Sequence, residues 1–126
     1  MPRSLDEYLP LKAIDFHILL VLTDRGPLHG YGMVGQIEER SDGRLRLEPG
    51  NLYRYIRRLV DGGLVEPTEP RRLVGADRRR DYRVTTRGRR VLAAEVGRMR
   101  GLIRAAEAGL AEDGPALSGV PGRADP

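Results

Sequence analysis

Glycine-containing breaks divide the N-terminal half of the chain into short segments, and this division constrains the fold more than any other sequence feature. Residues 13–23 are apolar on nearly every face, which fits a buried strand or a buried helix, and their length favours a helix. Residues 31–40 show helical spacing before a turn that contains glycine. A third segment begins at Pro49, which suits a first helical turn, and ends at the Gly-Gly pair after Asp61. The sequence therefore predicts three short helices.

The spacing of apolar residues changes after this Gly-Gly pair. Residues 64–70 and 80–85 are short, partly alternating runs, and the segment between them is strongly basic, so we expect a two-stranded hairpin with a long basic tip. Thr85 or Thr86 can then cap a long final helix that extends to residue 111. The last residues, 112–126, are small and rich in Pro and Gly, and we expect them to form a disordered tail.

Gly30, Gly32 and Gly35 have the spacing G-x-G-x-x-G, which is also the fingerprint of dinucleotide-binding folds. Those folds place the first glycine directly after a strand, whereas here the residues DRGPLH intervene. Tyr31 and Met33 would crowd a pyrophosphate, and no parallel strand rich in Val and Ile follows. We therefore expect these glycines to permit a tight turn and close helix packing. We predict no nucleotide or other cofactor and no enzyme activity.

Length and composition exclude several other classes of protein. The chain has 126 residues, enough for one small domain with tails. It contains no cysteine, and its two histidines, His17 and His29, lack the spacing of a zinc site, so we predict no metal and a structural role for each histidine. The N-terminus has no long apolar stretch, and no segment approaches the length of a membrane span. We therefore predict a cytoplasmic protein.

The arginines of the third predicted helix indicate a nucleic-acid contact. Lys and Arg exceed Asp and Glu by 22 to 18, a net charge of +4. On a helical wheel, one face is apolar and consists of Leu52, Tyr55, Ile56, Leu59 and Val60. The opposite face carries Asn51, Arg54, Arg57 and Arg58. Arginine can bond guanine, asparagine can bond adenine, and Tyr53 at the edge can donate to a phosphate. The alternative is a charged face that is merely solvated.

The predicted hairpin tip strengthens the nucleic-acid interpretation. Arg78, Arg79 and Arg80 are consecutive there, and Arg71 and Arg72 lie across the hairpin. In a winged helix-turn-helix domain, which has this order of three helices, a hairpin and a further helix, such cations meet DNA phosphates. We therefore expect a mainly α fold with a small β-hairpin. Its predicted parts are an N-terminal arm (1–12), a winged helix-turn-helix domain (13–85), a dimerisation helix (86–111) and the tail (112–126).

Three separate segments carry a family resemblance. They are GPLHGYGMVGQIEER, EPGNLYRYIRRLVDGGLVE and RRRDYRVTTRGRRVL. Together they resemble the PadR family of bacterial transcriptional regulators, in particular its short members with a single C-terminal helix, over residues 12–105. The resemblance implies a homodimeric repressor that a small effector releases. It also implies that the arginines of the predicted hairpin, together with Tyr31, Asn51, Leu52 and Tyr53, belong to DNA-binding motifs. Leu52 is nevertheless a core position on the wheel. The family more often has a small hydroxyl residue in place of Asn51, which leaves the base preference open.

The final predicted helix carries an apolar seam. Its members alternate spacings of four and three residues and are Leu92, Val96, Met99, Ile103, Ala106 and Leu110. Such a seam can pack within its own domain or against a second copy, and we predict a homodimer, with help from the first helix and the N-terminal arm. Two-fold symmetry would place two recognition helices about one DNA turn apart, so the expected operator is an inverted repeat.

The resemblance also implies a hydrophobic effector between two final helices. Candidate ligand residues are Phe16, Met99 and Ile103, which are equally good core residues. Three hypotheses about function follow: a dimeric DNA-binding repressor, a winged-helix module that contacts proteins, and a nucleotide-dependent enzyme. The sequence favours the first hypothesis, with double-stranded DNA and a second copy of the chain as partners.

Overall fold

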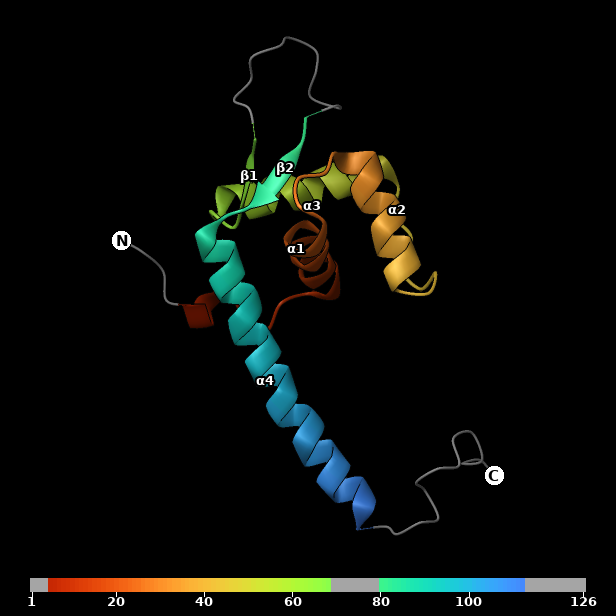
Figure 1. Cartoon of the computed structure of the whole chain (residues 1–126), viewed down its shortest axis with the longest axis vertical. Helices are drawn as coiled ribbons and strands as arrows, with labels where there is room; N and C mark the ends of the chain where they lie inside the picture. Colours follow the sequence, from red (N-terminus) through yellow and green to blue (C-terminus); the bar gives the residue numbers. More distant parts are fainter. Residues whose placement is uncertain (1–4, 69–79, 113–126) are drawn as a thin grey trace. The chain divides into compact units, whose positions relative to one another are not determined.

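The computed structural model describes residues 5–68 and 80–112. In chain order, their elements are a 3₁₀ helix η1 (Leu5–Tyr8), α1 (Ala13–Arg25), α2 (Gly30–Arg40), α3 (Pro49–Asp61), β1 (Val65–Pro67), β2 (Tyr82–Val84) and α4 (Thr86–Ala111) (Figure 1). The chain divides into two compact units, Met1–Ala93 and Ala94–Pro126, so α4 begins in the first unit and continues in the second. This mainly helical fold with an antiparallel hairpin confirms the predicted fold class.

The core of the first unit surrounds α1. Figure 1 shows α2 beside α1 and α3 lying across it. Four buried side chains of α1 contribute to the core: Ile18, Leu19, Val21 and Leu22. The other buried members are Met33, Ile37, Leu52, Ile56, Leu59, Leu64, Val65, Val84, Val91 and Leu92. Because α1 has packing partners on several sides, its sequence is apolar on nearly every face.

The helix ends follow signals in the sequence. The Thr85 hydroxyl accepts a hydrogen bond from the Gly88 amide at 2.9 Å and so caps α4, which confirms one of the two predicted caps. At the end of α3, the amides of Gly63 and Leu64 donate to carbonyl groups of the last helical turn, and the helix stops at the predicted Gly-Gly pair.

The hairpin is shorter than the sequence predicts. The antiparallel residue pairs of β1 and β2 are Val65 with Val84, Glu66 with Arg83 and Pro67 with Tyr82. The other edge of β2 binds the segment before α2, because the Tyr82 amide donates to the Leu28 carbonyl at 2.9 Å and the Leu28 amide donates to the Tyr82 carbonyl at 3.2 Å. The predicted basic tip falls on residues 69–79, outside the described part of the chain.

The first turns of α4 belong to the core of the first unit. Gly88 packs so closely on the Leu64 carbonyl and the Val84 side chain that a Cβ atom at this position would overlap both. Val91 is fully buried, and Leu92 is 8% exposed. The structure thereby corrects the prediction that Leu92 lies in a dimer seam, because its side chain fills the core of its own unit.

The N-terminal arm is tied to the first unit. The Tyr8 hydroxyl donates to the Gly62 carbonyl at 2.9 Å and accepts a hydrogen bond from the Arg87 guanidinium at 3.5 Å. Leu5 and Leu9 are half-buried against the core. The arm therefore connects the end of α3 to the start of α4.

The second unit contains the remainder of α4, residues 94–111. Glu95 accepts hydrogen bonds of 2.6 and 2.8 Å from the guanidinium of Arg98 in the same helix. Further along, Leu102, Ile103 and Leu110 are 57%, 53% and 55% exposed. In the part of the chain that the structure describes, no helix has the length and apolar character needed to cross a membrane. The predicted disordered tail falls almost entirely on residues 113–126, which lie outside that part.

Candidate nucleic-acid interface

α3 has a buried face and an exposed face, as the helical wheel predicts. The buried side chains are Leu52, Ile56 and Leu59, at most 4% exposed. The exposed ones include Asn51, Arg54 and Arg57. Tyr55 and Val60, which the wheel places on the apolar face, are half-buried against the core. Because one face is packed against the domain, the exposed face presents its polar side chains on a rigid support.

Asn51 and Arg54 form a pair on the exposed face. The Arg54 guanidinium donates to the Asn51 side-chain oxygen, one helical turn away, at 3.0 Å. This contact restricts the rotamers of both side chains and uses one of the five N–H donors of the guanidinium. The other donors, together with the Asn51 amide, suit acceptors such as base edges and phosphate oxygens.

Arg58, predicted to contact DNA, forms an ion pair with another helix of the domain. Its guanidinium donates to both carboxylate oxygens of Asp15 on α1, each at 3.0 Å, and lies over the ring of Tyr55, 5.2 Å from its centre. The Asp15 side chain is 11% exposed, and that of Arg58 is 47% exposed. We therefore revise the assignment of Arg58, since its charge compensates a buried carboxylate and anchors α3 to α1.

Asp15 itself was not singled out from the sequence. The available signal was an acidic residue within a mostly apolar segment, AIDFHILL. A carboxylate in such a segment needs a charged or hydrogen-bonded partner if the segment is buried. The sequence does not identify which of the many arginines is that partner.

Tyr53 lies at the junction of α2 and α3. Its phenol packs against the backbone of Gly30, where a Cβ atom would overlap the ring and its hydroxyl oxygen. The first glycine of the G-x-G-x-x-G spacing thus permits close helix packing, as predicted, whereas a Cβ at Gly35 would meet open space. Tyr53 is half-buried, and this packing fixes the position of its ring beside the exposed face of α3.

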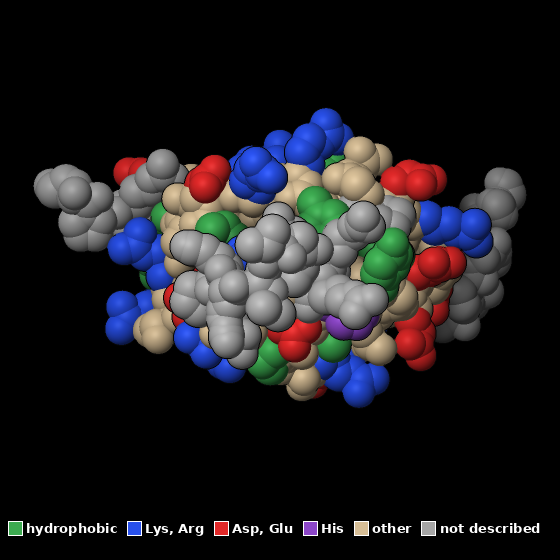
Figure 2. Space-filling model, turned by 90° about the horizontal axis from the view of Figure 1, so that it is seen from above, with side chains coloured by type: hydrophobic (Ala, Val, Ile, Leu, Met, Phe, Trp, Pro, Cys, Tyr) green, Lys and Arg blue, Asp and Glu red, His purple; other side chains and the backbone are tan. Residues whose placement is uncertain are grey.

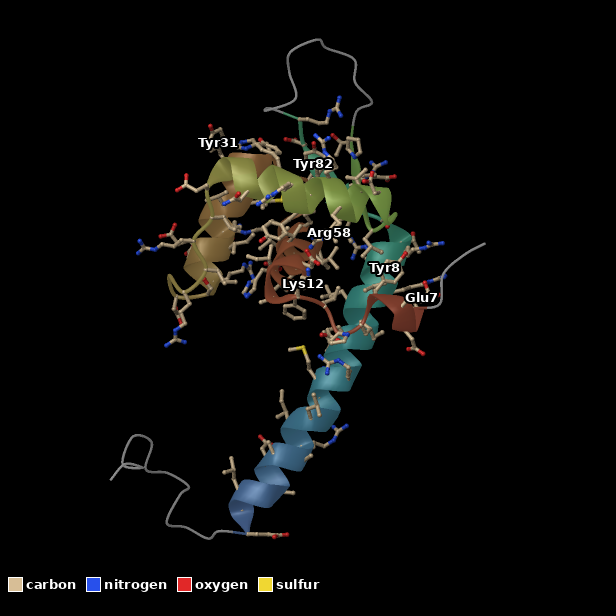
Figure 3. All side chains as sticks on the ribbon, turned by 180° about the vertical axis from the view of Figure 1, so that it is seen from behind. Glu7, Tyr8, Lys12, Tyr31, Arg58 and Tyr82 are labelled. Carbon is tan, nitrogen blue, oxygen red and sulfur yellow. The ribbon has the colours of Figure 1, made fainter. Side chains whose placement is uncertain are left out.

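The start of α2 adds a further aromatic side chain near this face. His29 caps α2, because its Nδ1 atom accepts a hydrogen bond from the Gly32 amide at 3.2 Å, which gives it the expected structural role. Tyr31 is 59% exposed and makes an edge contact with the His29 ring, with 6.4 Å between the ring centres. Figure 3 shows Tyr31 at the end of α2 that adjoins α3, directed to the side from which the hairpin projects.

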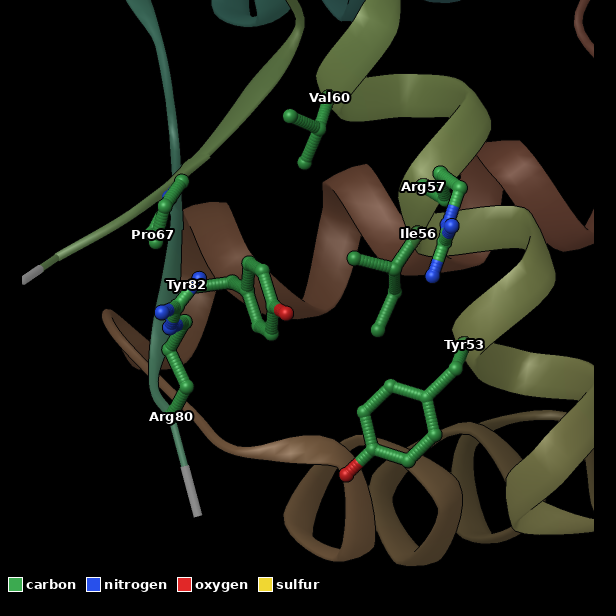
Figure 4. Close-up of a pocket in the computed structure, with 7 residues that line it drawn as sticks. All are labelled: Tyr53, Ile56, Arg57, Val60, Pro67, Arg80 and Tyr82. Carbon is green, nitrogen blue, oxygen red and sulfur yellow. The ribbon is translucent and has the colours of Figure 1, made fainter. Parts of the chain in front are cut away.

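A crevice of about 290 Å³ opens between α3 and the hairpin (Figure 4). Tyr53 and Arg57 line it from α3, and Arg80 and Tyr82 line it from the hairpin. Arg80 is therefore close to α3. The other four arginines predicted at the hairpin tip lie outside the described residues: Arg71, Arg72, Arg78 and Arg79.

The surface around the hairpin carries charges of both signs. Figure 2 looks onto the face from which the hairpin projects, and it shows Lys and Arg side chains on several sides together with a group of acidic side chains near one end. Among the described residues on this face, positive and negative side chains therefore lie side by side. A contact with a nucleic acid on this face would therefore depend on the individual cations of α3 and the hairpin more than on the overall charge of the chain.

A model of the transcriptional regulator PadR-like family matches residues 18–94. The matched stretch is more than half of the chain and contains α2, α3, the hairpin and the buried start of α4. The chain belongs to the PadR-like family. This family consists of transcriptional regulators and not of enzymes, which confirms the family resemblance of the sequence and the prediction that the chain is not an enzyme.

Solved structures include other proteins with this PadR-like fold. A PadR family transcriptional regulator from Eggerthella lenta DSM 2243 is 30% identical, with a TM-score of 0.55 over 74% of this chain and 80% of that one. A transcriptional regulator from Clostridium thermocellum is 20% identical, with a TM-score of 0.61 over 75% of this chain and 87% of that one. The chain in a complex structure of hsRosR-S4 is 24% identical, with a TM-score of 0.62 over 89% of this chain and 96% of that one. The last two likenesses show the fold alone.

A curated relative is much longer than the segment that it shares with this chain. It is an uncharacterized 37.1 kDa protein in transposon TN4556 of Streptomyces fradiae, 39% identical over 82 residues. The match covers 65% of this chain and 21% of that protein. The chain thus matches about a fifth of that relative's length.

The predicted effector and dimer residues of this PadR-like chain have different environments. Phe16 is half-buried against the core of the first unit. Met99 and Ile103 belong to the second unit, where Met99 is half-buried and Ile103 is exposed. Of the remaining seam residues, Val96 is half-buried, whereas Ala106 and Leu110 are exposed. Across residues 5–68 and 80–112, no three His, Asp or Glu side chains are grouped as a metal site requires.

Proposed function

We propose that the protein regulates transcription by binding a specific DNA duplex through α3 and the hairpin. α3 enters the major groove, where Asn51, Arg54 and Arg57 bond base edges. Arg80 and the adjacent hairpin contact the phosphate backbone, with Tyr53 and Tyr31 at the margin of the interface. The observation that carries this proposal is the division of α3 into a face that is buried in the domain and a face that exposes Asn51, Arg54 and Arg57.

The regulator acts as a homodimer. The second unit exposes Leu102, Ile103 and Leu110, each by more than half of its surface. Exposed apolar side chains on one helix favour burial against another helix, and a second copy of the same seam supplies a self-complementary surface. A two-fold dimer would place two α3 helices on the two halves of an inverted repeat. By family resemblance, such a dimer acts as a repressor that a small hydrophobic effector releases.

A winged-helix module that contacts another protein is the second candidate function. The charges of both signs that Figure 2 shows among the described residues around the hairpin favour it, because strongly one-signed surfaces are typical of proteins that bind DNA by charge. This candidate assigns Arg54 and Arg57 to a solvated surface. It predicts little salt-dependent binding of any duplex.

Fluorescence anisotropy on duplex DNA tests the proposal. The full chain is titrated onto the duplex upstream of its own gene and onto a scrambled duplex, over a range of salt concentrations. We expect preferential binding of the native duplex, with two protomers per site and an affinity that falls as salt rises. Absence of binding to both duplexes at low salt would contradict the proposal and favour the protein-contact module.

A substitution pair tests the role of α3 in the same assay. Arg54→Ala is expected to weaken binding to the native duplex by about 1 to 3 kcal/mol and to reduce the preference over the scrambled one, because a base contact is lost. Arg104→Ala removes the same charge from an exposed position of the second unit and is the control. Equal loss of affinity for both duplexes in Arg54→Ala would contradict base reading by Arg54.

A further inference from the structure

The ion pair between α1 and α3 is directional. Asp15 is buried in α1, and both of its carboxylate oxygens accept hydrogen bonds of 3.0 Å from one guanidinium nitrogen, Nη2 of Arg58. Figure 3 shows Arg58 on the side of α3 that faces α1. Charge-assisted hydrogen bonds are strong and weaken steeply when their geometry changes. The pair therefore restricts the rotation of α3 about its own axis relative to α1.

Arg58 belongs to the same strip of α3 as two residues that the proposed function assigns to base reading. Successive residues of an α-helix are rotated by about 100°, so Arg58 lies between Asn51 and Arg54 around the helix axis. At a helix radius of roughly 5 to 6 Å, a rotation of about 10° moves a side chain by about 1 Å. Hydrogen bonds span a range of only about 0.5 Å in length. A small rotation of α3 is therefore enough to lose a base contact.

The other contacts of α3 constrain its position more than its rotation. The aliphatic side chains of its buried face gain free energy from burial, which is non-directional. Near its start, the ring of Tyr53 packs on Gly30 of α2. Beyond its end, the Tyr8 hydroxyl donates to the carbonyl of Gly62. The ion pair adds a polar, directional contact to this packing, within the strip that faces the proposed groove.

We propose that Asp15 is a positioning residue for base reading, which sets through Arg58 the rotation at which Asn51 and Arg54 meet the major groove. Its own side chain lies on α1 and is 11% exposed, so it acts without touching DNA. Buried ion pairs often add little net stability compared with apolar side chains, and some of them select one arrangement among several. This inference rests on the proposed function.

Anisotropy measurements on the variant Asp15→Asn of the full chain test the assignment. The substitution removes one negative charge and keeps the size of the side chain. If Arg58 only supplied charge to the interface, releasing it would strengthen binding to both duplexes. We expect instead that the affinity for the native duplex, relative to the scrambled one, falls at least about fivefold, the equivalent of one weak base contact. A ratio equal to that of the natural protein would overturn the proposal.

Asp24→Asn is the matched control. Asp24 also lies on α1, but its carboxylate pairs with Arg40 of α2. The control variant therefore changes the net charge by the same amount and releases an arginine of a different helix. We expect it to keep the affinity ratio of the natural protein. An equal fall of the ratio in both variants would assign the effect to charge in general and overturn the proposal.

A double substitution separates positioning from stability. Asp15→Leu with Arg58→Met removes both charges, so no unpaired carboxylate remains in the core. We expect its melting temperature to lie above that of Arg58→Ala, which leaves Asp15 without this partner, while its affinity ratio stays at least about fivefold below that of the natural protein. A ratio that recovers together with the melting temperature would show that the pair acts through stability alone. If this variant fails to fold, Asp15→Asn still decides.

Residual dipolar couplings measure the orientation of α3 without DNA. We expect the amides of α1 and α3 in the natural protein to fit one rigid orientation, and the couplings of α3 to depart from it in Asp15→Asn but not in Asp24→Asn. Unchanged couplings of α3 in Asp15→Asn would overturn the positioning role. If the natural protein binds neither duplex, the proposed function fails, while the couplings still show whether Asp15 sets the orientation of α3.

Discussion

Arg54 and Arg58 lie one turn apart on α3 and have different environments. Arg54 is exposed and donates a hydrogen bond to Asn51, whereas Arg58 compensates the buried carboxylate of Asp15. We expect Arg58→Ala to lower the free energy of unfolding by roughly 1 to 3 kcal/mol, because Asp15 loses its charged partner. Arg54→Ala is expected to change it by less than about 0.5 kcal/mol. Urea unfolding at neutral pH measures both, and equal midpoints would contradict this distinction.

His17 makes the stability of the domain depend on pH. Its Nδ1 atom is buried without a hydrogen-bond partner in the structure, and burial, followed by the charge of Arg40, lowers the pKa of His17 from 6.5. Below pH 6.5 the unfolded chain therefore binds a proton at His17 more readily than the folded chain does. The free energy of unfolding is therefore not reduced by His17 well above pH 6.5. It decreases as the pH falls from 6.5 through the lowered pKa.

A histidine variant isolates this contribution. We expect His17→Gln to retain less pH dependence than the natural sequence between about pH 7.5 and pH 5, because the titrating group is removed. Urea unfolding at a series of pH values provides the comparison. An unchanged slope in His17→Gln would show that other groups dominate the pH dependence.

The sequence predicts the orientation of α3 better than the partners of its side chains. Helical spacing alone separates Leu52 and Ile56 from Asn51 and Arg54, because side-chain directions follow from backbone geometry. The partner of Arg58 is 43 positions away, in α1. Such a pairing depends on how two helices pack, which no local pattern records.

At the scale of elements, the sequence predicts the ends of α3 correctly but predicts strands that are longer than those in the structure. Pro49 and the Gly-Gly pair delimit α3 as predicted, because both residue types act on the local backbone. β1 and β2 each comprise three residues, Val65–Pro67 and Tyr82–Val84, although longer runs alternate in the sequence. Strand length depends on which residues find a pairing partner, and alternation does not identify that partner.

The contact between the hairpin and α4 tolerates no side chain at Gly88. A Cβ atom there would overlap the Leu64 carbonyl, a backbone atom that cannot move without distorting the hairpin. We expect Gly88→Ala to lower the free energy of unfolding by about 1 to 3 kcal/mol. Gly97→Ala, in the same helix with open space around it, is expected to raise it by about 0.5 to 1 kcal/mol. Thermal unfolding of both variants measures this, and a stabilised Gly88→Ala would contradict the contact.

At the scale of the whole molecule, the residues of the apolar seam of α4 lie in two different environments. The heptad spacing joins Leu92 to Ile103 and Leu110, yet Leu92 is buried in the first unit, whereas the other two are more than half exposed. Periodicity identifies one continuous apolar stripe. It does not reveal where packing within one chain ends and the proposed interface with a second chain would begin, because both bury the same kinds of side chain.

Charge in the exposed part of the seam should prevent assembly without unfolding the domain. We expect Ile103→Glu to shift the full chain from dimer to monomer, because an interface core does not accommodate an unpaired carboxylate. Arg104→Glu, at the adjacent exposed position, is the control and should remain dimeric. Sedimentation velocity gives the mass, and circular dichroism verifies the helical content. A dimeric Ile103→Glu would contradict the proposed interface.

The two faces of α3 have a consequence for how such regulators diversify. Leu52, Ile56 and Leu59 hold the fold together, whereas Asn51 and Arg54 make no contribution to its core. Substitutions on the exposed face are therefore expected to cost little stability. On the proposed function, a few codon changes in α3 would then retarget the protein to a new promoter without compensating changes in its core.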